Sequence, residues 1–190
     1  MSELRSSIPL TCERPTRADA ARNYDLLVRA AREAFTEHGA STSLEEIARR
    51  AGVGIGTLYR RFPTRTALLE AVYVEEIQSV CDQAYDFARD LPPYDALSAW
   101  LHAIARYANS KATLATELMD AIGKESEFFK ACKVNMLDAA GLLFGNAEKA
   151  GVIRPNLQAM DVLRLTGSIH DTDPDQADRM IDIIVAGLRP

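Results

Sequence analysis

Apolar residues recur at helical spacing along most of the chain. Between Arg17 and His38 they fall at every third or fourth position, which is the spacing of one buried helix face, and Gly39 follows as a stop. The same period predicts helices over residues 17–38, 43–51, 55–62, 64–90, 94–109, 112–121, 126–150, 159–170 and 174–188. No stretch of four or more residues alternates apolar and polar positions with β-branched enrichment, so no strand is predicted.

The first short helix after Gly39 begins with a capping box, Ser43-Leu44-Glu45-Glu46. In such a box the Ser43 hydroxyl accepts from the amide of Glu46, while the Glu46 carboxylate reaches back. Gly52-Val53-Gly54 then interrupts the helical pattern, and Pro63 ends the next helix. Thr64 is expected to cap the long helix that follows.

The spacing within residues 44–62 is typical of a helix-turn-helix. Ala48 is the small residue needed where the helices cross, and Gly52 tolerates the positive φ needed in the turn. The expected apolar anchors on the inner face are Ile47, Val53 and Leu58. The outer face of the second helix then carries small and polar groups suited to a DNA groove: Gly54, Gly56, Thr57, Tyr59, Arg60 and Arg61. A tight helical hairpin in an unrelated bundle is the alternative.

The charge of the chain is distributed unevenly. Residues 1–70 carry 11 arginines and 9 acidic side chains, a net charge of +2, whereas residues 71–190 carry 11 basic and 18 acidic side chains, a net charge of −7. A basic head on an acidic body suits binding to an anion. We therefore expect a flexible arm over residues 1–16, a head over residues 17–63 and a helical body over residues 64–190.

Composition narrows the class of protein further. Of the 190 residues, 47% are apolar and 26% charged, which is ordinary for a globular protein. No apolar run reaches the ~18 residues of a membrane span, and no secretory signal opens the chain. Cys12, Cys81 and Cys132 are too far apart for a disulfide framework and favour a cytoplasmic location, with Cys81 and Cys132 expected in the core.

Residues 17–72 resemble the N-terminal domain of the TetR (tetracycline-repressor) family of transcriptional regulators. The resemblance rests on Leu27, Ala30-Ala31, Ala34-Phe35, Gly39, Ser43 to Ala48, Ala51-Gly52-Val53, Gly56-Thr57-Leu58-Tyr59, Phe62 and Leu68-Leu69. It implies an all-α protein with a three-helix helix-turn-helix head and a C-terminal ligand-binding and dimerisation bundle. It also implies a homodimer that binds a near-palindromic operator in double-stranded DNA and leaves it when a small molecule enters the body. Repression is favoured over activation, and neither enzymatic activity nor a cofactor is expected.

The resemblance and the spacing together assign contacts within the helix-turn-helix. Ser43 is placed to donate its hydroxyl or its backbone amide to a phosphate. Gly54, Gly56 and Thr57 are expected nearest the bases, where the Thr57 methyl can touch a thymine methyl. Tyr59 is expected to contact a phosphate.

Arginines supply the remaining predicted contacts. Arg60 either reads a base edge or pairs with a phosphate, Arg61 adds a charge beside it, and Arg65 offers a bidentate fork to a phosphate. Arg14 and Arg17 of the arm are weaker candidates for the DNA backbone or the minor groove. The family often has Ser at the position of Gly54, His or Tyr at that of Arg61, and Lys at that of Arg65. The operator sequence of a relative therefore cannot be assigned to this chain.

The body offers candidates for a ligand cavity and for a dimer interface. Aromatic and methionine side chains that can line a cavity recur in the long helices, and most such residues simply pack a core: Tyr85, Trp100, Tyr107, Met119, Phe128 and Met136. The last two helices carry more apolar surface than one short helix buries alone: Met160, Leu163, Leu165, Ile169, Met180, Ile183, Ile184 and Leu188. They are the expected interface, and completion of the monomer's own core is the alternative.

The sequence gives little support for a metal site or for catalysis. Residues 171–175 begin like a calcium loop, but Pro174 and Gln176 do not fit, and a helix start capped by Asp173 explains the residues better. His38, His102 and His170 are isolated, so no metal site is expected. A helical enzyme or ligand carrier whose hairpin merely looks like a DNA reader is the rival interpretation.

Overall fold

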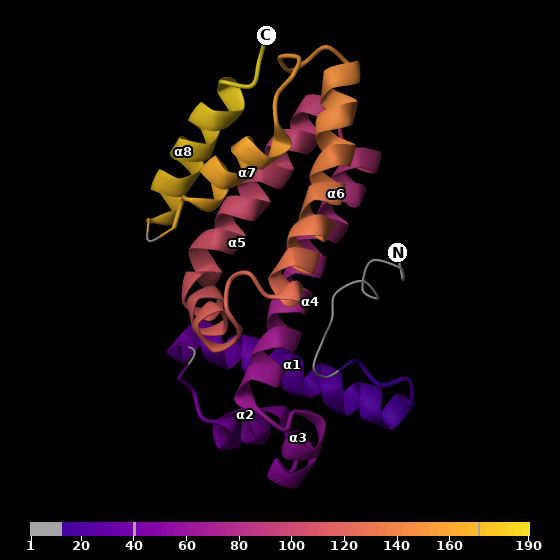
Figure 1. Ribbon diagram of the computed structural model, residues 1–190, viewed down its shortest axis with the longest axis vertical. Helices are drawn as coiled ribbons and strands as arrows, with labels where there is room; N and C mark the ends of the chain where they lie inside the picture. The colour runs from indigo at the N-terminus through magenta and orange to yellow at the C-terminus, as the bar shows by residue number, and fades with distance from the viewer. Residues whose placement is uncertain (1–12, 40, 171) are drawn as a thin grey trace. The chain divides into compact units, whose positions relative to one another are not determined.

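The computed structural model describes residues 13–39, 41–170 and 172–190, and over these residues the chain is all-α (Figure 1). Its helices are α1 (Ala18–His38), α2 (Leu44–Ala51), α3 (Ile55–Arg61), α4 (Arg65–Asp90), α5 (Pro93–Ile122), α6 (Glu127–Lys149), α7 (Ala159–Gly167) and α8 (Pro174–Ala186). The described residues contain no strand, and none of their helices is long and apolar enough to cross a membrane. The all-helical prediction is confirmed.

Side-chain caps fix three helix starts where the sequence predicts them. The Ser43 hydroxyl accepts from the Glu46 amide at 3.2 Å, and the Thr64 hydroxyl accepts from the Ala67 amide at 3.1 Å. Asp173 accepts from the Gln176 amide at 3.0 Å, with Pro174 at the first position of α8. Each cap satisfies an amide that the first turn of a helix leaves unpaired.

The predicted division of residues 94–121 into two helices is wrong, because α5 continues from Pro93 to Ile122. The stretch from Asn109 to Ala112 is polar but contains neither glycine nor proline, so nothing prevents the helix from continuing through it. The last two helices end earlier than predicted, α7 at Gly167 and α8 at Ala186.

The described residues form two compact units. The N-terminal unit contains residues up to Glu75 together with 113–129, and the C-terminal unit contains residues 76–112 and 130–190. Helices α4 and α5 therefore each contribute to both units.

The N-terminal unit has a core in which α2 packs against both α1 and α3 (Figure 1). Leu27, Ile47, Leu58 and Phe62 are completely buried, and the Phe62 ring lies 5.4 Å from that of Tyr24. Burial of such side chains contributes roughly 1.5–3 kcal/mol each. This core holds the two short helices in place.

The C-terminal unit is built around Trp100, which is completely buried. Its indole N–H donates to the Val80 carbonyl at 2.8 Å, so α5 is tied to α4 within this unit. Cys81 and Cys132 lie in the same core as free thiols, as expected from the sequence. Burial raises the pKa of each thiol to about 12, so both stay protonated at neutral pH.

The buried thiols yield a reactivity prediction. In a Cys12→Ser variant, which removes the cysteine outside the described residues, Cys81 and Cys132 should not react with a thiol reagent at pH 8. Both should react once urea unfolds the protein, because the thiolate is the nucleophile. Ellman titration before and after denaturation measures this, and rapid labelling of the folded variant would contradict it.

Candidate nucleic-acid interface

The turn between α2 and α3 has the geometry that the helix-turn-helix spacing predicts. Gly52 adopts φ 66° and ψ 26°, and its amide donates to the carbonyls of Ala48 and Arg49. The Val53 amide donates to the Ala48 carbonyl at 3.0 Å. Ala48 is 2% exposed, so the small residue lies buried at the base of the turn. This local structure reverses the chain and starts α3 at Ile55.

The exposed surface of α3 carries small residues at its start and an arginine near its end. Gly54 and Gly56 are exposed, and an added Cβ at either would meet nothing within 4 Å. Arg60 is exposed and donates from Nη2 to the Thr57 hydroxyl at 3.1 Å and from Nε to the Gly56 carbonyl at 3.3 Å. Tyr59 is 44% exposed. The structure therefore brings five of the predicted DNA-binding residues together on one short helix and its cap.

Ser43 lies exposed at the start of α2, with its hydroxyl on the Glu46 amide. The Glu46 carboxylate does not complete the predicted capping box but pairs with Arg49 and Arg50, each at 2.8 Å. Hydrogen bonds from these two guanidinium groups lower the pKa of Glu46 to about 2. Arg50 also contacts Glu37 at 2.6 Å, which ties the end of α1 to α2.

Arg61 faces away from this surface. Its guanidinium carbon lies 5.0 Å from the centre of the Tyr24 ring, and its Nε and Nη2 atoms are buried without a hydrogen-bond partner. The side chain is half-buried against α1 rather than displayed beside Arg60.

Arg65 is also occupied inside the N-terminal unit. Its Nε atom donates to Glu117 at 2.9 Å, and its Nη1 atom donates to the Thr42 carbonyl at 2.6 Å. The guanidinium carbon lies 5.4 Å from the centre of the Phe35 ring, and Nη2 is buried without a partner. Sequence reasoning missed this cluster because Glu117 is 52 positions away and carries no local signal.

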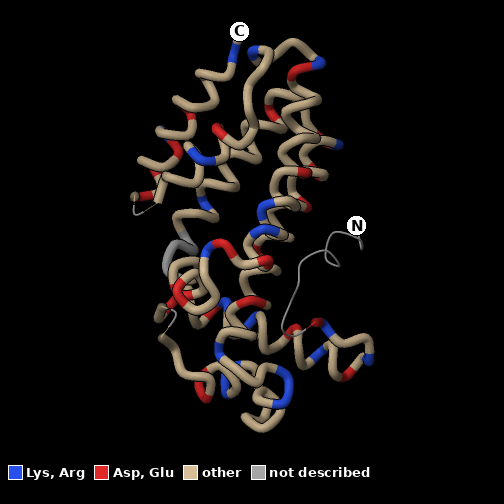
Figure 2. Tube along the Cα trace, viewed as in Figure 1, with Lys and Arg blue, Asp and Glu red and all other residues tan. Residues whose placement is uncertain are grey.

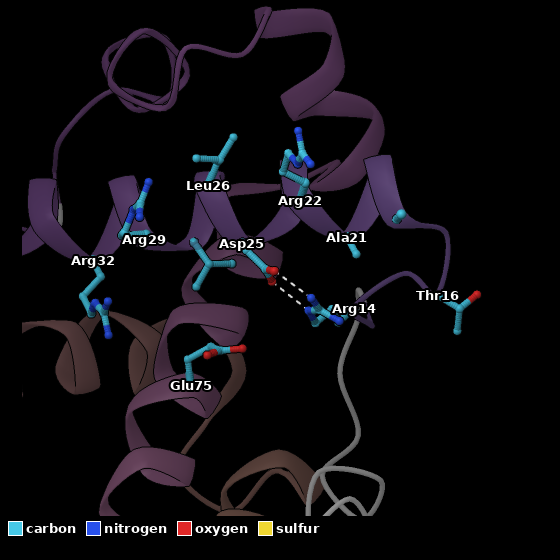
Figure 3. Close-up of a pocket in the computed structure, with 11 residues that line it drawn as sticks. Arg14, Thr16, Ala21, Arg22, Asp25, Leu26, Arg29, Arg32 and Glu75 are labelled. Atoms are coloured by element: carbon cyan, nitrogen blue, oxygen red, sulfur yellow. Dashed lines mark hydrogen bonds and ion pairs between the residues drawn. The ribbon is translucent and has the colours of Figure 1, made fainter.

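The arm meets α1 through a two-pronged ion pair. Arg14 donates from Nε and Nη2 to Asp25 at 2.7 and 2.6 Å, which raises the pKa of Arg14 (Figure 3). The pair borders an open groove of about 680 Å³, which Arg22, Arg29 and Glu75 also line. Arg17 is exposed immediately before α1. Blue segments along α1 and at the end of α3 in Figure 2 show how arginines recur in this unit.

The predicted ligand-binding residues are divided between the two units. Tyr85, Trp100, Tyr107 and Met136 lie in the C-terminal unit, whereas Met119 and Phe128 lie in the N-terminal unit. Trp100 is buried and Met136 half-buried, while Tyr85 is 36% exposed. Tyr107 borders an open groove of about 330 Å³ that Gln83 and Arg106 also line.

In the N-terminal unit, Met119 is 40% exposed, and Phe128 is buried in an aromatic cluster. The ring centres of Phe128 and Phe129 lie 5.8 and 5.5 Å from that of Tyr73. Among the residues that the structure describes, no three His, Cys, Asp or Glu side chains gather as a metal site.

Comparisons with known proteins agree with the geometry of α2 and α3. Residues 27–72 match the family model described as bacterial regulatory proteins, tetR family, and residues 92–190 match that of the SbtR-like transcriptional regulator, C-terminal domain. The chain belongs to the TetR family. It is a DNA-binding transcriptional regulator, as the residues of the helix-turn-helix predict.

Two solved TetR-family regulators are similar over most of their length. One, from Streptomyces coelicolor, is 35% identical with a TM-score of 0.75, and the match covers 88% of this chain and 98% of that one. The other, from Mycobacterium vanbaalenii, is 32% identical with a TM-score of 0.70, covering 93% and 100%. Comparison with curated proteins gives no match.

Proposed function

We propose that this TetR-family regulator is a cytoplasmic repressor that binds a near-palindromic operator as a homodimer and is released by a small molecule. The observation that carries the proposal is the exposed surface of α3. Gly54 and Gly56 leave room there for DNA to approach the backbone closely, and the Arg60 side chain is exposed on the same helix. Arginine suits both phosphates and the edge of guanine.

The proposed contacts use the side chains that α2 and α3 expose. Ser43 reaches a phosphate from the start of α2, and Tyr59 reaches another from α3. Thr57 lies nearest the bases, and its hydroxyl holds the Arg60 guanidinium. A contact from Arg61 or Arg65 would require the guanidinium to leave Tyr24 or Glu117 first.

The first test separates affinity from base preference. Arg60→Ala should weaken operator binding and, where Arg60 pairs with a phosphate, reduce the salt slope by roughly one unit. Thr57→Ser removes only the methyl group and should relax the preference for thymine, whereas Thr57→Val removes the hydroxyl that holds Arg60. Fluorescence anisotropy with a selected operator between 50 and 200 mM salt, a range over which phosphate contacts change affinity strongly, measures these effects.

Arg89→Ala is the matched control, because Arg89 is an exposed arginine on the part of α4 that belongs to the C-terminal unit. It should leave both affinity and salt slope unchanged. Equal behaviour of the Arg60 and Arg89 variants would contradict the assigned role.

The dimer interface is proposed on α7 and α8, which lie side by side in the C-terminal unit (Figure 1). Of the predicted interface residues, Leu163, Ile169 and Leu188 are buried in the unit's own core. Ile183 is 73% exposed and Leu165 57% exposed, so these large apolar side chains remain available to a partner. Two recognition helices one DNA turn apart, ~34–36 Å, require such a two-fold assembly.

A charge placed on this surface should separate the subunits. Ile183→Asp should weaken the dimer about 30-fold or more, which is the effect of losing an apolar hot spot, and operator affinity should fall with it. Val134→Asp on α6, where Val134 is 55% exposed, is the control and should leave the dimer intact. Sedimentation velocity at micromolar protein concentration measures the fraction of dimer. An Ile183→Asp variant that remains fully dimeric would show that the interface does not include Ile183.

The effector is proposed to be a mostly apolar small molecule bound within residues 64–190. Support comes from the aromatic side chains of the C-terminal unit, where Trp100 is buried and Tyr107 borders an open groove of about 330 Å³. A ligand shifts the protein away from DNA only if it binds the DNA-free form more tightly.

The single tryptophan reports on such a ligand. Compounds that change Trp100 fluorescence should also lower operator affinity, by ~5–150-fold for an ordinary coupling free energy. A screen with both readouts tests this, with Trp100→Phe as the control for inner-filter effects. Compounds that quench Trp100 while none changes DNA binding would rule out release by a ligand.

A further inference from the structure

The Arg65 guanidinium joins segments of the N-terminal unit that lie far apart in the sequence. It lies on the Phe35 ring of α1, donates to the Thr42 carbonyl before α2, and pairs with Glu117 on α5. Its remaining Nη2 atom is buried. These contacts engage the guanidinium with neighbouring protein groups.

The ion pair between Arg65 and Glu117 is partly buried. The exposed fractions of the two side chains are 28% for Arg65 and 33% for Glu117. A fully exposed pair would contribute about 0–1 kcal/mol, but partial burial strengthens the attraction and raises the cost of leaving one partner alone.

The Thr42 carbonyl, which accepts from Arg65, belongs to the residue directly before the cap of α2. Thr42 is 9% exposed, and its hydroxyl donates to the Gly39 carbonyl at 2.9 Å. With its carbonyl held by Arg65 as well, Thr42 is fixed on both sides. The next residue is Ser43, which caps α2 and presents its hydroxyl at the surface.

Glu117 lies on the segment of α5 that belongs to the N-terminal unit, whereas residues 93–112 of the same helix belong to the C-terminal unit. A rotation or shift of α5 along its axis therefore moves the Glu117 carboxylate. Since that carboxylate holds Arg65, the movement reaches Thr42 and the start of α2.

We propose that Glu117 is a positioning residue for DNA binding: through Arg65 it sets the place of Thr42 and Ser43, so that operator affinity depends on the position of α5. The inference rests on the proposed use of α2 and α3 to bind the operator. It gives Arg65 an internal role instead of a phosphate contact.

The experiment compares two variants that each remove one negative charge from the same helical segment. Glu117→Gln keeps the shape of the side chain but loses the charge that holds Arg65, while Asp120→Asn does the same at an exposed position three residues later. Against an operator selected from random DNA by the unaltered protein, Glu117→Gln should bind about 10-fold more weakly. Asp120→Asn should bind equally well or slightly more tightly.

The salt slope separates positioning from direct contact. Glu117→Gln should lose affinity with an unchanged salt slope, because no phosphate contact from a cation disappears. Arg65→Lys keeps the charge but loses the planar fork, and should resemble Glu117→Gln. A salt slope reduced by about one unit in Arg65→Ala would instead make Arg65 a phosphate contact and overturn the proposal.

Amide hydrogen exchange provides a readout that needs no DNA. Residues 42–47 should exchange faster in Glu117→Gln than in Asp120→Asn, because the start of α2 loses its support. Identical exchange and identical operator affinity in the two variants would overturn the inference and leave the proposed function standing. Failure of the unaltered protein to select any DNA would overturn both.

Discussion

The left-handed conformation of Gly52 is the constraint on which the helix-turn-helix depends. With φ 66°, its amide closes the end of α2 on the Ala48 and Arg49 carbonyls, and the chain turns at once into α3. A residue with a side chain would cost about 1–2 kcal/mol in this conformation. The turn lets Ile47 and Leu58 bury themselves completely in one core, and their burial fixes which face of α3 remains outside.

The arginines near α3 show how position along a helix decides the role of a charge. Arg60 and Arg61 are adjacent, yet successive residues of an α-helix point about 100° apart. Arg60 therefore lies on the exposed surface with Thr57, whereas Arg61 packs on Tyr24. The aromatic face partly offsets the cost of burying donors that have no hydrogen-bond partner.

Local patterns were sufficient to predict most of the fold, because caps, glycines and helical periodicity act over a few residues. The cap at Ser43, the turn at Gly52 and the start of α8 at Asp173 all follow from neighbours within four positions. The division of α5 was a local error, since polar residues do not end a helix. The ion pair of Arg65 was beyond such reasoning, because its partner Glu117 is brought close only by tertiary packing.

The continuity of α5 changes what the molecule can transmit. Had the helix ended near Asn109, residues 113–122 would be joined to the C-terminal unit by a loop, and a loop absorbs displacement through its own dihedral angles. An unbroken helix instead carries a shift along its whole length, because each residue is hydrogen-bonded to the one four positions earlier. Helix α4 shares this property, since it also contributes to both units. The difference is that α4 begins at Arg65, whereas Glu117 lies in the last turns of α5. The ion pair between them therefore joins the two continuous helices close to the start of α2.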